Sequence, residues 1–319
     1  MFSVDLSFVI IEYHCPDSVL SCLNSIKKAC TGASCEVIVS SNSMYNPKQQ
    51  EFLIHKIPDV KWVFNACNKG FAGGMNAGIL LSRGKVIVLT NPDVTLTGCN
   101  ITKAYDYLML HDNVGLLGPK IVDRYGHIQD SCRNFMGLKE FFSRIYQRLS
   151  LGRDVLLNNM FDYTAQQPVD WVIGAFMLVR REALAKVGLL DDNYFLYVED
   201  MDWCRRFWES GFQIVYFPQI QVGYKGDRKS TSSLVKKRML NKYACCHLKS
   251  YMRFLWKNKF QVARIKSPPP ACVNAVVSTS RNDHIETNEP ESAGFAIQAA
   301  GRNNNEHHSL ELTNMGEKL

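Results

Sequence analysis

The chain has 319 residues, of which 46% are apolar and 21% charged, so a sizeable core can form without help from disulfides. Its eleven cysteines include no CxxC pair and no metal-ligand spacing, and we expect free thiols in a reducing cytoplasm. No apolar run reaches the roughly 18 residues that would span a membrane. The first five residues also lack the basic start of a signal peptide.

The net charge of +7 is distributed unevenly. Residues 225–266 contain thirteen Lys and Arg residues and one acid, a local charge of +12 that leaves −5 for the rest of the chain. Such a surface indicates nucleic acid, an anionic membrane, a phosphorylated substrate or a plain solvated face. Aromatic residues alternate with the basic ones over 234–260, which favours a helix lying on an anionic bilayer. No nucleic-acid-binding motif accompanies the charge, so we expect no nucleic-acid partner.

The first part of the chain alternates between strand and helix patterns. Asp17 or Ser18 is expected to cap the first helix, Gly32 to end it and Pro47 to open the second. Strands are expected at 6–11, 36–40, 60–64 and 85–90, and helices within 15–32, 47–57 and 68–84. This alternation predicts an α/β domain with a mainly parallel central sheet.

The second part of the chain is less regular. The pattern predicts a helix over 98–111, a strand over 114–118, a helix near 138–150, a strand–turn–strand–helix unit over 169–184, a helix ending at Gly211, a strand over 212–218 that Pro218 stops, and a basic helix over 234–260. We expect a globular domain over 1–233, a basic amphipathic helical segment over 234–266 and a disordered tail over 267–319.

Two stretches favour a bound phosphate compound. "NPDV" (91–94) follows a predicted strand, and a carboxylate at a strand end suits a Mg²⁺ ion that also takes phosphate oxygens. The glycines of "NKGFAGGMNAGI" (68–79) surround a helix start, where backbone can approach a phosphate or sugar. The alternatives are an ordinary Asn-Pro-Asp turn and close helix packing.

A third stretch, "NYFLYVEDMDWCRRFW" (193–208), places three acids after an aromatic run. Helix capping explains part of this pattern, because a helix N-terminus stabilises carboxylates. Asp202 is expected to pair with Arg205 or Arg206 on the same helix. The aromatic lead-in indicates that the remaining acids face a cleft, where a carboxylate can deprotonate a hydroxyl.

Taken in order, "FVIIEYHCPDSVLSCLNSI", "NKGFAGGMNAGI", "LTNPDV" and "VDWVIGAFMLVRREALAKVGLLDDNYFLYVEDMDWCRRFWESGFQIVYFP" resemble the GT-A glycosyltransferases of family 2, in particular the rhamnosyltransferase-like branch. The resemblance covers roughly residues 5–235. It implies a GT-A fold, in which a Rossmann-like nucleotide-binding half and an acceptor half share one mostly parallel sheet. It also implies a nucleotide-sugar donor, most often dTDP-L-rhamnose, and one inverting displacement.

The resemblance assigns roles residue by residue. Asp200 matches the catalytic base and Glu199 its support, while Asp93 matches the position that binds Mg²⁺ or Mn²⁺. The residues implied on the donor side are Tyr13, Asn68, Gly70, Gly73, Asn76, Asn91 and Asp93, with Lys225 and Arg228 at the diphosphate. Those implied on the acceptor side are Trp171, Gly174, Ala175 and Trp203.

Three stretches depart from the family pattern. Ser40 stands where an acid commonly contacts the base or ribose, Tyr224 stands where a His often helps to hold metal or phosphate, and Glu12 and His14 flank Tyr13 unusually. We expect an enzyme at the inner face of the cell membrane that extends a saccharide or lipid-linked acceptor for a surface polysaccharide. The alternative is a non-catalytic sugar-nucleotide-binding or scaffold protein of the same pathway.

Overall fold

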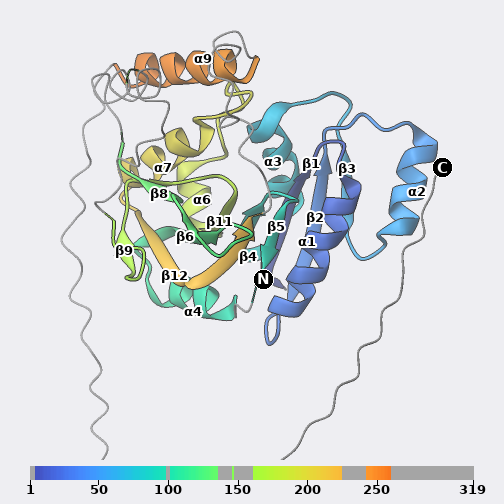
Figure 1. The fold of residues 1–319 in the computed structure, drawn as a ribbon, viewed down its shortest axis with the longest axis horizontal. Helices are drawn as coiled ribbons and strands as arrows, with labels where there is room; N and C mark the ends of the chain where they lie inside the picture. The colour runs from blue at the N-terminus through green and yellow to red at the C-terminus, as the bar shows by residue number, and fades with distance from the viewer. Residues whose placement is uncertain (1–3, 98–100, 136–145, 147–160, 225–241, 260–319) are drawn as a thin grey trace, which may run out of the picture. The chain divides into compact units, whose positions relative to one another are not determined.

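The computed structural model describes residues 4–97, 101–135, 146, 161–224 and 242–259. All of them belong to one compact unit, Met1–Cys272, and the second unit, Val273–Leu319, lies outside the described residues. Figure 1 shows a central sheet with helices packed against it. The strand order along this sheet is β3-β2-β1-β4-β11-β6-β12-β5.

The first half of this path is parallel. It consists of β1 (Val4–Glu12), β2 (Cys35–Ser41), β3 (Lys61–Phe64) and β4 (Gly84–Thr90). The pairs β1–β2, β1–β4 and β2–β3 all run in the same direction, so their carboxyl ends meet at one edge of the sheet. This confirms the expected strand–helix alternation.

The second half is mixed. It consists of β5 (Val94–Leu96), β6 (Val114–Val122), β11 (Phe176–Arg180) and β12 (Gln213–Tyr224). β11 is antiparallel to both β4 and β6, whereas β6 and β12 are parallel. The short strands β7 (Ile128–Gln129) and β9 (Gln167–Pro168) extend this sheet, and β8 (Cys132–Arg133) pairs with β10 (Trp171–Val172) apart from it.

Helices cover both faces of the sheet. They are α1 (Pro16–Ala29), α2 (Pro47–Lys56), α3 (Gly70–Leu81), α4 (Thr102–Leu110), α6 (Arg181–Val187), α7 (Glu199–Glu209) and α9 (Lys242–Lys257). One apolar core joins α1 and α4 to the strands, and the other joins α3, α6, α7 and α9 to the opposite face. Alternate residues of β1 supply each side, with Phe8 in the first core and Val9 in the second.

Two expectations about element ends are corrected. Neither Asp17 nor Ser18 caps α1, because Pro16 already occupies the first turn and Cys15 precedes the helix without a side-chain cap. The strand β12 does not stop at Pro218. Its register with β6 shifts between Phe217 and Gln221, and such an irregularity tolerates a residue without a backbone N–H.

Other expectations fall partly outside the described residues. The helix expected near 138–150 lies there, as does the start of the basic helix over 234–260, of which α9 is described. Pro47 does open α2, and Asn46 and Gln49 form a reciprocal capping box before it. Within the part of the chain that is described, none of the helices combines the length and the apolarity needed to cross a membrane.

Candidate active site

The turn after β4 carries Asn91, Pro92 and Asp93. The Asn91 N–H donates to the carbonyl oxygen of Ala175 at 3.0 Å, and the Val94 N–H closes the turn onto the Asn91 carbonyl at 3.3 Å. Among the described residues, nothing donates a hydrogen bond to the buried Asn91 Oδ1. A buried amide oxygen in this state is a ready ligand for a cation or a donor group.

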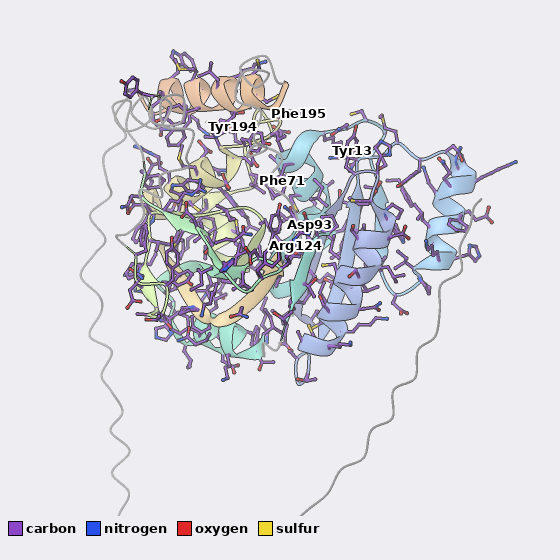
Figure 2. All side chains as sticks on the ribbon, viewed as in Figure 1. Tyr13, Phe71, Asp93, Arg124, Tyr194 and Phe195 are labelled. Carbon is purple, nitrogen blue, oxygen red and sulfur yellow. The ribbon has the colours of Figure 1, made fainter. Side chains whose placement is uncertain are left out.

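The turn before β11 joins this site to the start of α7. The Gly174 N–H donates to Asp200 Oδ2 at 2.9 Å, while the next residue, Ala175, accepts from Asn91. A Cβ on Gly174 would lie 3.3 Å from the Phe71 ring and 3.5 Å from Asp200, so this position suits glycine. Figure 2 labels Phe71, on α3, and Asp93, in the turn after β4. Asp200 and Asn91 are therefore hydrogen-bonded to two consecutive residues, Gly174 and Ala175.

Asp200 lies in the first turn of α7. Its Oδ1 accepts from the Met201 N–H at 2.9 Å and its Oδ2 from Gly174, which leaves each oxygen a further lone pair. Burial raises the pKa of Asp200, although these two hydrogen bonds and the positive charge of Arg133 oppose the shift. A carboxylate with a raised pKa and a fixed orientation is a stronger proton acceptor.

Glu199 lies beside Asp200 but faces the core. It is 5% exposed, and no described residue donates to its buried Oε2. Burial and the neighbouring Asp200 carboxylate raise the pKa of Glu199 well above its ordinary value. Within the pair, Glu199 therefore favours its protonated form more strongly than Asp200 does, and Asp200 is the member whose hydrogen bonds oppose the shift.

Arg133 is a site residue that sequence reasoning missed. It pairs with Trp171 across the β8–β10 ladder, and its guanidinium lies 5.2 Å from the centre of the Trp171 ring. It also binds Asp130 at 2.9 Å, and its charge lowers the pKa of Asp200. The sequence around Arg133 carries no motif, so only the tertiary structure brings it close enough to affect Asp200.

The glycine-rich stretch forms the start of α3. Asn68 Oδ1 accepts from the Gly70 N–H at 2.9 Å, and Gly70 has a φ of +70°. A Cβ on Gly70 would overlap the carbonyl oxygen of Phe195, to which the Phe71 N–H donates at 2.9 Å. Gly73 packs closely as well, with Lys69 Cβ 2.9 Å from where its own Cβ would be. The predicted donor loop thus contacts the segment that precedes Asp200.

Two residues of the predicted site have other roles in the structure. Trp203 is fully buried and donates through Nε1 to the Gly188 carbonyl at 2.9 Å. An acceptor could not reach its side chain, so the acceptor-side role expected for Trp203 is wrong. The Asn76 amide makes two hydrogen bonds to the backbone of Leu190, at 2.8 and 3.1 Å, and these join α3 to the loop before α7. Its donor and acceptor groups are both used within the protein.

The remaining predicted positions lie at the rim or beyond the described residues. Tyr13 is 52% exposed at the end of β1. Tyr224 pairs with Val94 across β12 and β5, one residue from Asp93. Lys225 and Arg228 follow directly in the chain but lie outside the described residues.

The family commonly has an acid at the end of β2, where this chain has Ser40. Here a buried carboxylate lies at the end of the neighbouring strand β1. It belongs to Glu12 of β1, which is 0% exposed and accepts from the Cys15 N–H at 2.8 Å and from Ser41 Oγ at 2.5 Å. Ser43 and Tyr45 also donate to it, at 2.9 and 3.1 Å. Ser40 itself is buried and accepts from Asn65. Glu12 therefore ties the ends of β1 and β2 together.

The residues present fit a divalent cation with few protein ligands. No group of three or more His, Cys, Asp or Glu side chains gathers in the described ranges. Asn91 and Asp93 lie on one tight turn, where Asn91 presents its buried amide oxygen. Mg²⁺ and similar ions accept such a sparse oxygen set when substrate phosphates complete the shell.

A model of the family described as "Glycosyltransferase like family 2" matches residues 5–243. The chain belongs to this family. The resemblance inferred from the motifs is thus confirmed, and the matched range runs from the second residue of β1 through β12.

Curated relatives include proteins named rhamnosyltransferases. The chain is 26% identical over 190 residues to the N-acetylglucosaminyl-diphospho-decaprenol L-rhamnosyltransferase of Mycobacterium tuberculosis, covering 53% of this chain and 60% of the relative. It is 25% identical over 208 residues to the low-salt glycan biosynthesis hexosyltransferase Agl10 of Haloferax volcanii, covering 63% and 61%. It is 33% identical over 91 residues to rhamnosyltransferase WbbL of Escherichia coli, covering 28% and 32%. The match thus spans less than two thirds of each relative.

Solved structures share the fold at low identity. GalNAc-T7, solved with UDP, GalNAc and Mn²⁺, superposes with a TM-score of 0.57 at 14% identity, covering 79% of this chain and 48% of that chain. The mannosyltransferase PcManGT of Pyrobaculum calidifontis, solved with GDP-Man and Mn²⁺, superposes with a TM-score of 0.50 at 14% identity, covering 85% and 67%. This likeness confirms the GT-A fold.

Proposed function

We propose that this protein is an inverting glycosyltransferase that moves a sugar from a nucleotide-diphosphate donor to a saccharide or lipid-linked acceptor. Rhamnose is the favoured sugar and dTDP-L-rhamnose the favoured donor, because two of the similar proteins are named rhamnosyltransferases. The expected pathway is the synthesis of a surface polysaccharide.

One observation carries the proposal. Gly174 binds Asp200 and Ala175 binds Asn91, so one short turn connects the predicted base with the predicted donor-side turn. An inverting displacement needs a base on one side of the reacting carbon and the leaving group on the other. A rigid link of two residues supports that arrangement, because it fixes the separation between the two groups.

Asp200 is the proposed base. It would accept the proton of the acceptor hydroxyl as the hydroxyl oxygen attacks C1 of the donor sugar from the face opposite the diphosphate. The Gly174 N–H keeps the carboxylate oriented through the reaction. Burial, which raises the pKa of Asp200, also strengthens it as a proton acceptor.

The donor side is formed by the turn after β4 and the start of α3. Asn91 and Asp93 would hold a Mg²⁺ or Mn²⁺ ion, which when bound supplies positive charge for the departing diphosphate. Gly70 and Gly73 let α3 pack closely against Phe195 and Lys69, and the start of this helix would face the donor phosphates. The Phe71 ring packs beside Gly174 and would help to exclude water from this side when a donor is bound.

The test is nucleotide release from a donor panel of dTDP-L-rhamnose, UDP-galactose, UDP-glucose and GDP-mannose, with Mg²⁺ or Mn²⁺. We expect release from dTDP-L-rhamnose that falls at least tenfold in Asp200→Asn and in Asp93→Ala. Asp106→Asn is the control, since Asp106 is an exposed carboxylate on α4. Undiminished release in either site variant refutes the role given to that residue. Donor binding without any release would indicate the sugar-nucleotide-binding scaffold instead.

Helix α9 supports peripheral attachment to the inner face of the membrane. Leu248, Met252 and Trp256 recur every four residues and are 49%, 43% and 78% exposed. Lys249 and Arg253 are exposed next to them. An apolar stripe with basic neighbours suits the headgroup region of an anionic bilayer, and a lipid-linked acceptor would be found at such a surface.

Vesicle sedimentation tests this attachment. We expect the protein to bind vesicles that contain phosphatidylserine more strongly than neutral ones, and to be released by high salt. Trp256→Ser should weaken binding several-fold, whereas Leu110→Ser, at a residue 79% exposed on α4, should not. Equal binding to neutral and anionic vesicles would contradict the proposal.

A further inference from the structure

The loop that leads into Asp200 has an unfavourable backbone. Tyr197 and Val198 have φ values of +71° and +73°. A β-branched residue in the left-handed region is a rare conformation, and it persists only where surrounding contacts hold it. Val198 directly precedes Glu199 and Asp200, and α7 has no side-chain cap at this end. Whatever holds this loop therefore sets the direction of the base.

The same loop also contacts the donor side. The carbonyl oxygen of Phe195 accepts from the Phe71 N–H at 2.9 Å and lies against Gly70. Phe71 in turn packs against Gly174, which binds Asp200. Residues 194–198, here named the base loop, thus connect the start of α3 with the start of α7.

Helix α9 packs directly on the base loop. Ser250 Oγ donates to the carbonyl oxygen of Leu196 at 2.9 Å, and the rings of Tyr197 and His247 meet edge to face at 5.3 Å. Figure 2 shows Tyr194 and Phe195 beneath this helix. The buried residues Tyr251 and Phe254 anchor α9 to the core. The helix therefore has its own fixed position from which to hold the loop.

Lys257, at the end of α9, ties both flanks of the base loop. Its Nζ lies 2.8 Å from Asp191 Oδ2, before the loop, and 2.9 Å from Asp202 Oδ1, after it. Burial alone would raise the pKa of Asp191, but hydrogen bonds from Lys257 and Asn193 lower it to about 2. The carboxylate is thus fully ionised at neutral pH, and the ion pair is intact.

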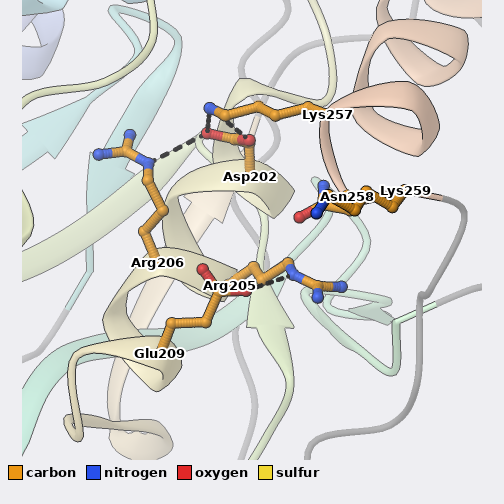
Figure 3. A pocket seen from close by; sticks show the side chains of 7 residues that line it. All are labelled: Asp202, Arg205, Arg206, Glu209, Lys257, Asn258 and Lys259. Carbon is orange, nitrogen blue, oxygen red and sulfur yellow. Dashed lines mark hydrogen bonds and ion pairs between the residues drawn. The ribbon is translucent and has the colours of Figure 1, made fainter.

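The Lys257 side chain lies at the edge of a surface pocket. Figure 3 shows its ammonium group beside Asp202, which Arg206 binds from the other side at 3.1 Å. A cavity of about 310 Å³ lies between these side chains and the end of α9. Ion pairs therefore connect the end of α9 with α7 here, in addition to the apolar contacts that Tyr251 and Phe254 make with the core.

We propose that α9 positions the catalytic base. Through Ser250 and Lys257 it holds the base loop in its strained conformation, and the loop then fixes both Asp200 and the Phe71 side of the donor site. Both are positioning residues, since neither would touch the substrate. This inference rests on the proposed function, and it gives α9 an inward role in addition to its outward apolar stripe.

The test compares Lys257 variants of the full chain by nucleotide release from dTDP-L-rhamnose, well below each variant's melting temperature. We expect Lys257→Met to lower kcat about tenfold and to raise the donor KM by a smaller factor, because the loop orients Asp200 directly and contacts the donor side only through Phe71. Lys257→Arg should restore most of kcat, since a guanidinium can bridge both carboxylates. Ser250→Ala should lower kcat a few-fold. Lys103→Met, at an exposed lysine of α4, should change nothing.

Two results would overturn the proposal. One is wild-type kcat in Lys257→Met, and the other is an equal loss in Lys103→Met. If no donor turns over even in the wild-type protein, the proposed function fails, and hydrogen exchange then decides this inference separately. We expect faster exchange over residues 194–201 and at the Phe71 amide in Lys257→Met but not in Lys103→Met. Unchanged exchange there refutes the positioning role.

Discussion

The two halves of the sheet place their polar groups by different kinds of contact. In the parallel half, β1 and β2 end side by side, and Glu12 joins them through hydrogen bonds to Ser41 and Ser43. In the mixed half, Asp200 comes from a helix start and is held by Gly174 and by the base loop under α9. The first half is organised by neighbouring strand ends, and the second by segments far apart in the chain.

This difference teaches where the site is sensitive. Strand pairing along the parallel half fixes the register of many residues at once, so a single polar group there is supported by a continuous ladder. The base loop has no such ladder and adopts a strained backbone at Tyr197 and Val198. Each contact that holds it therefore matters more for activity than for overall stability. The following variants test this comparison.

The largest effect is expected at Gly70, where the two halves touch. Gly70→Ala forces a side chain into the Phe195 carbonyl at a φ of +70°. We expect the free energy of unfolding to fall by roughly 3 kcal/mol or more. Gly126→Ala is the matched control, because Gly126 has a φ of +84° and nothing within 4 Å of its missing Cβ. Its loss should be about 1 kcal/mol. Equal losses in urea denaturation would show that the contact is unimportant.

The next effect is expected in the parallel half. Glu12→Gln puts an amide NH₂ group where hydroxyl and N–H donors converge on a buried carboxylate. We expect a loss of about 2 kcal/mol in the free energy of unfolding. Glu51→Gln, at an exposed residue of α2, should stay within about 0.5 kcal/mol of wild type. If Glu12→Gln left the free energy of unfolding unchanged, the view that this carboxylate joins the two strands would be contradicted.

Glu199→Gln is expected to change how stability depends on pH. The pKa of Glu199 is raised in the folded protein by burial and by Asp200, so the folded state keeps a proton that the unfolded chain releases above its ordinary pKa of 4.5. Each pH unit between that value and the raised pKa then costs wild type about 1.4 kcal/mol of stability. The variant cannot ionise, so its stability relative to wild type should increase as the pH rises above 4.5 toward the raised pKa of Glu199. A constant difference between the two melting curves would contradict this.

The smallest effect is expected at Arg133. Burial raises the pKa of Asp200, and the Arg133 charge opposes that shift, so Arg133→Gln should raise the pKa further. A carboxylate must be ionised to accept a proton, and the acid limb of kcat/KM should therefore move to higher pH. Arg133→Lys, which keeps a positive charge, should leave the limb closer to wild type. If the acid limb of kcat/KM stays at the wild-type pH in Arg133→Gln, Arg133 does not influence the pKa of Asp200.

Sequence reasoning found the site motifs because they are local. The "NPDV" turn, the glycines from Gly70 and the Glu199–Asp200 pair are each a short run, and each lies at an element end in the structure. The expected tie of Asp202 to its own helix is confirmed for Arg206, whereas Arg205 binds Glu209 instead. One turn of helix places both arginines near acids, and only packing decides which pair forms.

The missed features depend on contacts between distant segments. Arg133 reaches the base through a two-residue ladder with Trp171, and Lys257 reaches Asp191 from 66 residues away in the chain. The motif suggested that Trp203 lies on the acceptor side, but Trp203 is on the face of α7 that packs into the core and is fully buried. Neither spacing nor residue type records which face of α7 is covered by α6 and the sheet.

For this protein, the sequence by itself determined the family, the strand–helix alternation and the chemical groups available for transfer, because hydrophobic period and short motifs act over a few residues. Only the tertiary structure decided how those groups meet. It joined Asn91 and Asp200 through the turn at Gly174 and Ala175, buried Glu199 beside Asp200 so that its pKa is raised, and placed α9 on the base loop. These depend on burial and on close approach between segments distant in sequence, and such contacts exist only once the chain has folded.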